Sequence, residues 1–89
     1  MRVHVVFTTQ LKAAIGQASQ DIELAENASV QEAIAVIAEQ HSEAFSKYVL
    51  SGGQLIPSIL LSVNDQQASA DANLADGDTL TLLSAISGG

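Results

Sequence analysis

LADGDTLTLLSAISGG, residues 74–89, combines a turn, a strand and a tail, and the rest of the chain is organised around it. Asp76-Gly77-Asp78 is typical of a tight turn, because Gly adopts backbone conformations that other residues resist and Asp hydrogen-bonds its own backbone. Residues 79–84 then alternate threonine with leucine, which predicts a strand with one buried face. We therefore expect a folded domain over residues 1–84 and a short flexible tail over residues 85–89 that ends in Gly-Gly.

A helix is expected over residues 29–41. Ser29 is a favourable N-cap, and Glu32 occupies the capping-box position three residues later. The residues expected on one helical face are Val30, Ala33, Ile34, Ile37 and His41. This face predicts a helix that packs on a sheet.

The N-terminal residues predict a β-hairpin. Arg2 to Thr9 reads RVHVVFTT, with apolar residues at every second position. Gly16 and the polar residues after it suit the turn, and Asp21 to Leu24 alternates polar and apolar again.

The middle of the chain predicts further short elements. A second helical stretch is expected over Glu43 to Leu50, with Ser42 as its cap. Ile59 to Val63 is nearly continuously apolar, as in a buried central strand. Asn64-Asp65 is a turn signal, and Gln66 to Ser69 is polar enough to be a short edge strand.

The order of these elements defines an α+β fold in which one main helix covers one face of a small mixed sheet. Apolar residues make up 47% of the chain, but Phe7, Phe45 and Tyr48 are its only aromatic residues. The core must therefore be aliphatic, and no aromatic platform for stacking nucleic-acid bases is expected.

Charge and cysteine content exclude several functional classes. Ten acidic residues against three basic ones give a formal net charge of −7, which repels nucleic-acid phosphates and anionic membranes. We expect partners with basic surfaces and neither nucleic acid nor membrane. The absence of cysteine excludes disulfides and thiol chemistry, and no leader-like segment is seen at the N-terminus. A cytoplasmic protein is expected.

Side chains suited to catalysis are few. His4 and His41 are the two histidines, and structural roles are expected for both because neither has a nucleophile or metal partner in the sequence. Asp71, Asp76 and Asp78 lack the spacing and the terminal Glu of a calcium loop. We expect no metal site and no active site of the chain's own.

The C-terminal carboxylate is the remaining chemical group. A carboxylate becomes an acyl donor once a leaving group such as AMP is attached, inside a site that excludes water. Gly88 and Gly89 lack Cβ atoms, so their backbone can enter a channel that side chains would block. Gly-Gly at a chain end thus suits a terminus that is modified by a partner enzyme.

Four stretches resemble the ubiquitin-like sulfur carriers of MoaD/ThiS type, and the small subunit of molybdopterin synthase in particular. They are VVFTTQLKAAIG (5–16), SVQEAIAVIAEQ (29–40), ILLSVNDQQ (59–67) and the final LADGDTLTLLSAISGG. The last stretch is the most specific, since it joins the Asp-Gly-Asp turn to a strand and a terminal Gly-Gly. The resemblance spans the chain and implies a ubiquitin-like β-grasp fold.

The resemblance also implies a function as a protein substrate rather than an enzyme. A ubiquitin-activating-type enzyme, using ATP and magnesium, would adenylate the Gly89 carboxylate, and a persulfide would then displace AMP to leave a thiocarboxylate. The large subunit of molybdopterin synthase would receive the tail and use its sulfur. Gly88 and Gly89, with Ala85, Ile86 and Ser87 as the threading segment, are the implied site residues.

Two departures leave the destination of the sulfur open. Residues 84–87 lack the proline that often precedes the family's terminal residues, and the segment 41–58 is longer than usual. Carriers that supply thiamine, cysteine or a specialised metabolite are alternatives, as are a ubiquitin-like modifier of lysines and a non-covalent binding module. In each case we expect an apolar patch on the sheet to dock to the partner, with the acidic remainder aiding encounter.

Overall fold

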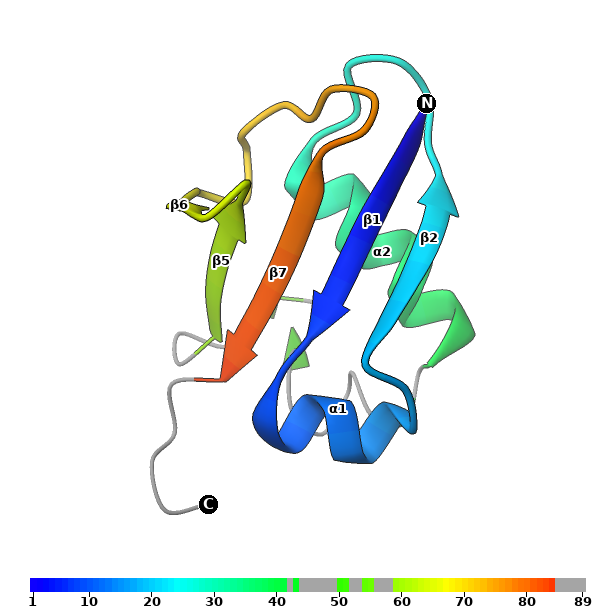
Figure 1. Ribbon diagram of the computed structural model, residues 1–89, viewed down its shortest axis with the longest axis vertical. Helices are drawn as coiled ribbons and strands as arrows, with labels where there is room; N and C mark the ends of the chain where they lie inside the picture. The colour runs from blue at the N-terminus through cyan, green and yellow to red at the C-terminus, as the bar shows by residue number, and fades with distance from the viewer. Residues whose placement is uncertain (42, 44–49, 52–53, 56–58, 85–89) are drawn as a thin grey trace.

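The computed structural model describes residues 1–41, 43, 50–51, 54–55 and 59–84. Five strands form its main sheet in the order β2-β1-β7-β5-β6 (Figure 1). These strands are β1 (Arg2–Phe7), β2 (Ser19–Glu23), β5 (Ile59–Val63), β6 (Gln66–Gln67) and β7 (Thr79–Ser84). β7 lies at the centre, parallel to β1 and antiparallel to β5. The predicted mixed sheet is confirmed.

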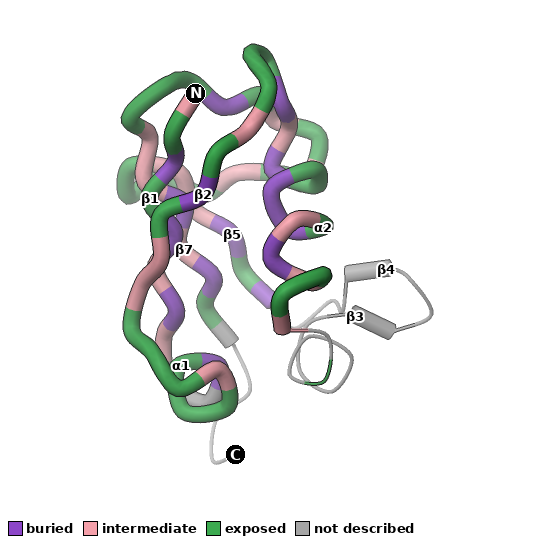
Figure 2. Tube along the Cα trace, turned by 90° about the vertical axis from the view of Figure 1, so that its right-hand side faces the viewer, coloured by how far each residue is buried: buried purple, intermediate pink, exposed green. Residues whose placement is uncertain are grey.

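Helix α2 (Val30–Gln40) covers one face of this sheet (Figures 1 and 2). Its start is fixed by the predicted capping box: the Ser29 hydroxyl accepts from the Glu32 amide at 3.2 Å, and the Glu32 carboxylate accepts from the Ser29 amide at 3.4 Å. The helix ends at His41, whose amide donates to the Ile37 carbonyl. The sequence therefore predicted this element correctly at both ends.

The core lies between α2 and the inner face of the sheet. Strand β1 shows how it is built, because Val3, Val5 and Phe7 are fully buried or nearly so while the residues between them are exposed or half-buried. The other core residues are Leu11, Ile22, Val30, Ala33, Ile34, Ile37, Ile59, Leu61, Leu74, Leu80 and Leu82. Among the core residues that the structure describes, Phe7 is the one aromatic residue, in agreement with the predicted aliphatic core.

The predicted turn between the first two strands is wrong, although the pairing is right. β1 and β2 are antiparallel, from Arg2↔Glu23 to Val6↔Ser19, but a helix, α1 (Thr9–Ile15), connects them. Its sequence TQLKAAI is rich in strong helix formers, and Leu11 anchors it in the core. Gly16, at φ 88°, is the left-handed C-cap of this helix rather than a hairpin residue.

The two turns predicted between residue 64 and the last strand agree with the sequence. Asn64 and Asp65 have φ of 52° and 69°, the left-handed pair that a tight hairpin requires, and they connect β5 to β6. β6 is a two-residue edge strand, shorter than the predicted 66–69. Gly77 has φ 86° in the turn before β7.

β5 is not the buried central strand that its apolar run predicted. β7 takes the central position, and β5 has only β6 beyond it. Its burial alternates, with Ile59 and Leu61 in the core and Leu60 between them exposed. The run ILLSV was predicted to be buried on both faces because it has leucine at consecutive positions, one facing the core and one facing solvent.

Two short strands, β3 (Leu50–Ser51) and β4 (Gln54–Leu55), pair antiparallel in a sheet of their own. The second helix predicted for 43–50 lies largely outside the described residues, and its last residue, Leu50, belongs to β3. Within the described ranges, neither α1 nor α2 has the length and hydropathy needed to cross a bilayer.

Candidate functional site

The site predicted from the sequence begins where β7 ends. The backbone of this strand is fixed on both sides, by Phe7↔Leu82 towards β1 and by Ile59↔Ser84 towards β5. Leu82 is thus paired on the β1 side and Ser84 on the β5 side. The five residues named as site residues, Ala85, Ile86, Ser87, Gly88 and Gly89, lie outside the described residues.

The start of β7 is fixed by a network of polar contacts. The Asp76 carboxylate accepts from the Arg2 amide at 2.7 Å, and the Gly77 amide donates to the Arg2 carbonyl at 2.8 Å. Asp78 accepts from the Ala75 amide and from the Asn64 side-chain amide, each at 2.9 Å. The carboxylates of the predicted Asp-Gly-Asp turn therefore hold the turn in place.

Near the end of β7, a side chain that follows strand β1 contributes one hydrogen bond. The Thr8 hydroxyl donates to the Leu82 carbonyl at 2.9 Å, across 74 positions of sequence. Thr8 is the residue between β1 and α1, so this contact is made at the point where the unpredicted helix begins. Sequence reasoning did not find either, because Thr8 and Thr9 continue the alternation of β1.

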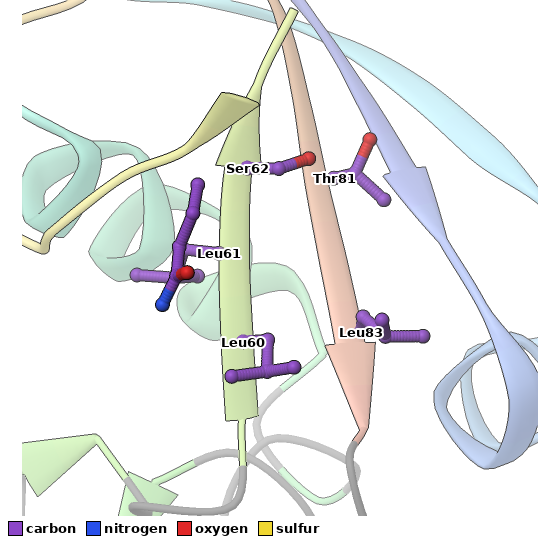
Figure 3. A pocket seen from close by; sticks show the side chains of 6 residues that line it. Leu60, Leu61, Ser62, Thr81 and Leu83 are labelled. Atoms are coloured by element: carbon purple, nitrogen blue, oxygen red, sulfur yellow. The ribbon is translucent and has the colours of Figure 1, made fainter. Parts of the chain in front are cut away.

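The outer face of the sheet carries an apolar hollow next to the end of β7 (Figure 3). Leu60 and Leu83 are cross-strand partners on β5 and β7, and they are 42% and 38% exposed. The hollow has a volume of about 170 Å³ and is lined by Leu60, Leu61, Ser62, Gln67, Thr81 and Leu83. In the part of the chain that the structure describes, Leu60 and Leu83 are the exposed large hydrophobic residues. We call these two leucines and Thr81 the outer patch.

The outer face is charged further from the end of β7. His4 Nδ1 lies 2.6 Å from the Asp21 carboxylate, and the Arg2 guanidinium lies 3.1 Å from Glu23. Both pairs join β1 to β2 and are well exposed. The face thus changes from polar and charged side-chain pairs at one corner to leucines at the end of β7.

Both histidines have structural contacts, as the sequence predicted. His4 is paired with Asp21, while His41 hydrogen-bonds Gln20 at 3.1 Å and places its ring edge-on to Phe7. Among the described residues, no three His, Cys, Asp or Glu side chains come together as a metal would require.

A central C-terminal strand parallel to the first strand, with one helix across the sheet and an open outer face, defines a ubiquitin-like β-grasp protein. The model of the ThiS family matches residues 5–89. The chain therefore belongs to the ThiS family. Members of this group are small carrier or modifier proteins that act with partner enzymes, rather than catalysts themselves.

Solved structures share the fold over almost the entire chain. SAMP1 from Haloferax volcanii is 22% identical over 100% of both chains, with a TM-score of 0.91. A protein assigned as molybdopterin converting factor subunit 1 from Pyrococcus furiosus is 24% identical, covering 97% of this chain and 99% of its own, with a TM-score of 0.79. One chain of the Amycolatopsis orientalis BexX/CysO complex is 28% identical, covering 98% and 99%, with a TM-score of 0.73. No curated protein sequence matches the chain.

Proposed function

We propose that this chain carries sulfur as a thiocarboxylate on its C-terminal residue, Gly89. The observation that carries the proposal is the family match, which continues past the last strand to residue 89. β7 supports it, because a central strand held on both sides presents the segment after Ser84 at a defined place. Residues 85–89 are then the flexible segment that enters a channel in the partner, with Ala85, Ile86 and Ser87 threading into it ahead of Gly88 and Gly89.

The chemistry requires a partner enzyme that binds ATP and magnesium. The Gly89 carboxylate attacks the α-phosphorus of ATP, which releases pyrophosphate and forms an acyl-adenylate. A persulfide sulfur then attacks the acyl carbon and AMP leaves. A second thiol cleaves the remaining S–S bond, so that the thiocarboxylate is released while the two thiols are oxidised to a disulfide. This chain supplies only the carboxylate. The partner enzyme supplies the ATP site, and ATP is available in the cytoplasm, which is the proposed location of the protein.

The outer patch is the proposed docking surface for the adenylating enzyme. Leu60 and Leu83 are exposed leucines next to the root of the tail, and buried apolar anchors of this kind dominate the energetics of interfaces. The patch and the tail would bind one partner together, since both lie at the same end of β7. A net charge of −7 favours a basic partner surface around this contact.

The molybdopterin precursor is the proposed sulfur acceptor, with this chain as the small synthase subunit. The resemblance of residues 74–89 to that subunit supports this choice, as does the fold shared with the Pyrococcus furiosus protein. Conjugation to lysine is the second candidate, favoured by the fold shared with SAMP1, a protein called a small archaeal modifier. The likeness to one chain of the BexX/CysO complex supports a third destination, a carrier for another sulfur-accepting enzyme.

The mass of the intact protein tests the proposal. After incubation with ATP, the adenylating enzyme of the same organism and a persulfide donor, we expect a gain of about 16 Da, as one terminal oxygen is replaced by sulfur. A variant that lacks Gly89 is the control and is expected to lose at least about a hundredfold in rate, because its carboxylate is displaced by one residue. An unchanged mass for the wild-type chain, with an enzyme shown to activate another carrier, contradicts sulfur carriage; conjugates to lysine in the same reaction favour the modifier.

A further inference from the structure

Strand β2 forms one edge of the main sheet, and in the part of the chain that the structure describes this edge is open. β2 pairs with β1 alone, in consecutive pairs from Arg2↔Glu23 to Val6↔Ser19. Figure 2 views the sheet from this edge, and no other strand lies in front of β2. The opposite edge differs, because β6 is a strand of two residues. Short edge strands resist pairing with other chains, whereas a regular open strand is a template for it.

The bonds at the two ends of the β1–β2 pair show which backbone groups of β2 are free. Met1 and Leu24 exchange two hydrogen bonds, at 2.7 and 2.8 Å, and the Phe7 amide donates to the Ala18 carbonyl at 2.8 Å. Hydrogen-bonded pairs alternate along antiparallel strands, so the even-numbered residues of β2 bond to β1. The amides and carbonyls of its odd-numbered residues therefore point to the open edge.

Three residues supply the groups of the open edge, and these are Ser19, Asp21 and Glu23. Among the described residues, their amides and carbonyls have no hydrogen-bond partner, so each residue offers one donor and one acceptor. The strand itself is held against α2, because the Gln20 side chain bonds to Gln40 and lies 3.1 Å from His41 Nε2. The edge is thus ordered before a partner binds, which lowers the entropic cost of binding.

Charge identifies the kind of segment that suits this edge. Asp21 and Glu23 extend from the outer face of the sheet, since Ile22 between them is in the core. Each carboxylate is paired with a basic side chain of β1, His4 or Arg2. A cation on an added strand would place each carboxylate between two basic groups, and opposite charges at facing positions stabilise a sheet. A second copy is disfavoured, because antiparallel pairing centred on Asp21 would set two such carboxylates against each other.

We propose that the open edge of β2 binds a basic, extended segment of a partner protein, which joins the main sheet as an additional strand. The segment's backbone bonds to the free groups of Ser19, Asp21 and Glu23, and its lysine or arginine side chains, at every second position, face the two carboxylates. The outer patch lies on β5 and β7, and β1 separates β7 from β2. One carrier can therefore hold this segment and dock through the outer patch at the same time.

A synthetic peptide of alternating lysine and threonine, about as long as β2, is the probe. Threonine is β-branched and favours the extended conformation. The control is the same peptide with every backbone amide N-methylated, because it retains all the charges but donates no backbone hydrogen bond. NMR titrations of the full chain with each peptide give the affinity, and amide hydrogen exchange at saturation gives the position of binding.

The expected result is an alternation along β2. Amide exchange of Ser19, Asp21 and Glu23 should slow when the peptide is bound. Exchange of Gln20 and Ile22 should change least, because their amides already bond to β1. The N-methylated peptide should bind at least about tenfold more weakly, since it loses several hydrogen bonds.

A pair of variants tests the role of charge. Asp21→Asn should weaken binding of the lysine–threonine peptide about two- to fivefold, because it removes one facing charge and leaves the backbone groups in place. Asp65→Asn is the matched control: it removes the same charge from the β5–β6 turn, where φ is 69° and asparagine tolerates the left-handed backbone. Asp65→Asn should bind the peptide as the wild type does, and so should Leu83→Ser in the outer patch.

Several results would overturn the proposal. Equal binding of the N-methylated peptide, or equal losses for Asp21→Asn and Asp65→Asn, would reduce the interaction to general attraction between opposite charges. Absence of binding at low salt would also overturn it. Slow exchange at the same amides that depends on protein concentration without peptide would identify a second copy as the occupant. None of these results bears on the proposed function, because adenylation of Gly89 does not require a strand at this edge.

Discussion

The two ends of β7 are held in different ways. At its start, Asp76, Asp78 and Asn64 surround the turn with side-chain hydrogen bonds between 2.7 and 3.0 Å. At its end, Thr8 supplies one bond and the adjoining outer face carries exposed leucines. At the start of β7 the polar side chains hydrogen-bond to neighbouring groups of the same turn region. At its end, the leucine side chains remain exposed to solvent. The difference leads us to expect that stability is concentrated at the start of the strand, while its end carries the proposed docking surface.

The largest effect should come from the start of the strand. Asp78→Ala removes the acceptor of two hydrogen bonds and leaves the Ala75 amide and the Asn64 side chain without it. We expect the free energy of unfolding to fall by about 1–3 kcal/mol, measured by urea denaturation. Binding to the adenylating enzyme should be unchanged under conditions in which the variant is folded.

Asp71→Ala is the matched control for that substitution. The Asp71 carboxylate accepts from the Ser69 hydroxyl two residues away and is exposed. Its removal should change the free energy of unfolding by no more than about 0.5 kcal/mol, as at other surface positions. Equal losses for the two variants would contradict the idea that the turn before β7 is a stability centre.

An intermediate effect is expected at the other end of β7, and on binding instead of stability. Leu60→Ser and Leu83→Ser each remove an exposed leucine from the outer patch. Each should weaken binding of the adenylating enzyme about tenfold, or about 1.4 kcal/mol, in calorimetric titrations. The midpoint of urea denaturation should move little, because both side chains are partly in water in the free protein.

Thr79→Ser provides a comparison on the same outer face of β7, closer to the strand's start. It keeps a hydroxyl at a half-buried position outside the hollow, so the affinity for the enzyme should stay within twofold of the wild type. Loss of affinity in Thr79→Ser equal to that in Leu83→Ser would show that the interface is not centred on the outer patch.

Sequence patterns specified the parts of the fold that depend on local chemistry. The capping box at Ser29, the turn at Asn64-Asp65 and the alternation of residues 79–84 each occur as predicted, because short-range hydrogen bonds and two-residue periodicity determine them. α1 was missed because Thr8 and Thr9 prolong the β pattern, although the helix formers in TQLKAAI and the burial of Leu11 both favour a helix there.

The candidate site was predicted less completely than the fold. The sequence pointed to the end of β7 and to an apolar patch on the sheet, and the structure places Leu60 and Leu83 there. It did not identify these leucines, since a continuous run such as ILLSV conceals which residue faces outward until the neighbouring strands are known. The bond from Thr8 to Leu82 spans 74 positions and has no local signature.

The smallest effect should come from the charged corner of the outer face. Arg2 and Glu23 are a cross-strand ion pair at 3.1 Å, with side chains 68% and 67% exposed. Glu23→Gln keeps an oxygen acceptor but removes the charge, so the free energy of unfolding should fall by less than about 1 kcal/mol.

Glu26→Gln is the control, because it removes one carboxylate from the same acidic chain without breaking an ion pair among the described residues. Both variants reduce the net charge of −7 equally, so the difference between them isolates the pair from the general repulsion. That difference should vanish in about 1 M salt, where the screening length is about 3 Å. A loss that persists at high salt would mean that Glu23 contributes to stability by packing or hydrogen bonding, and this corner would then resemble the start of β7 more than an exposed rim.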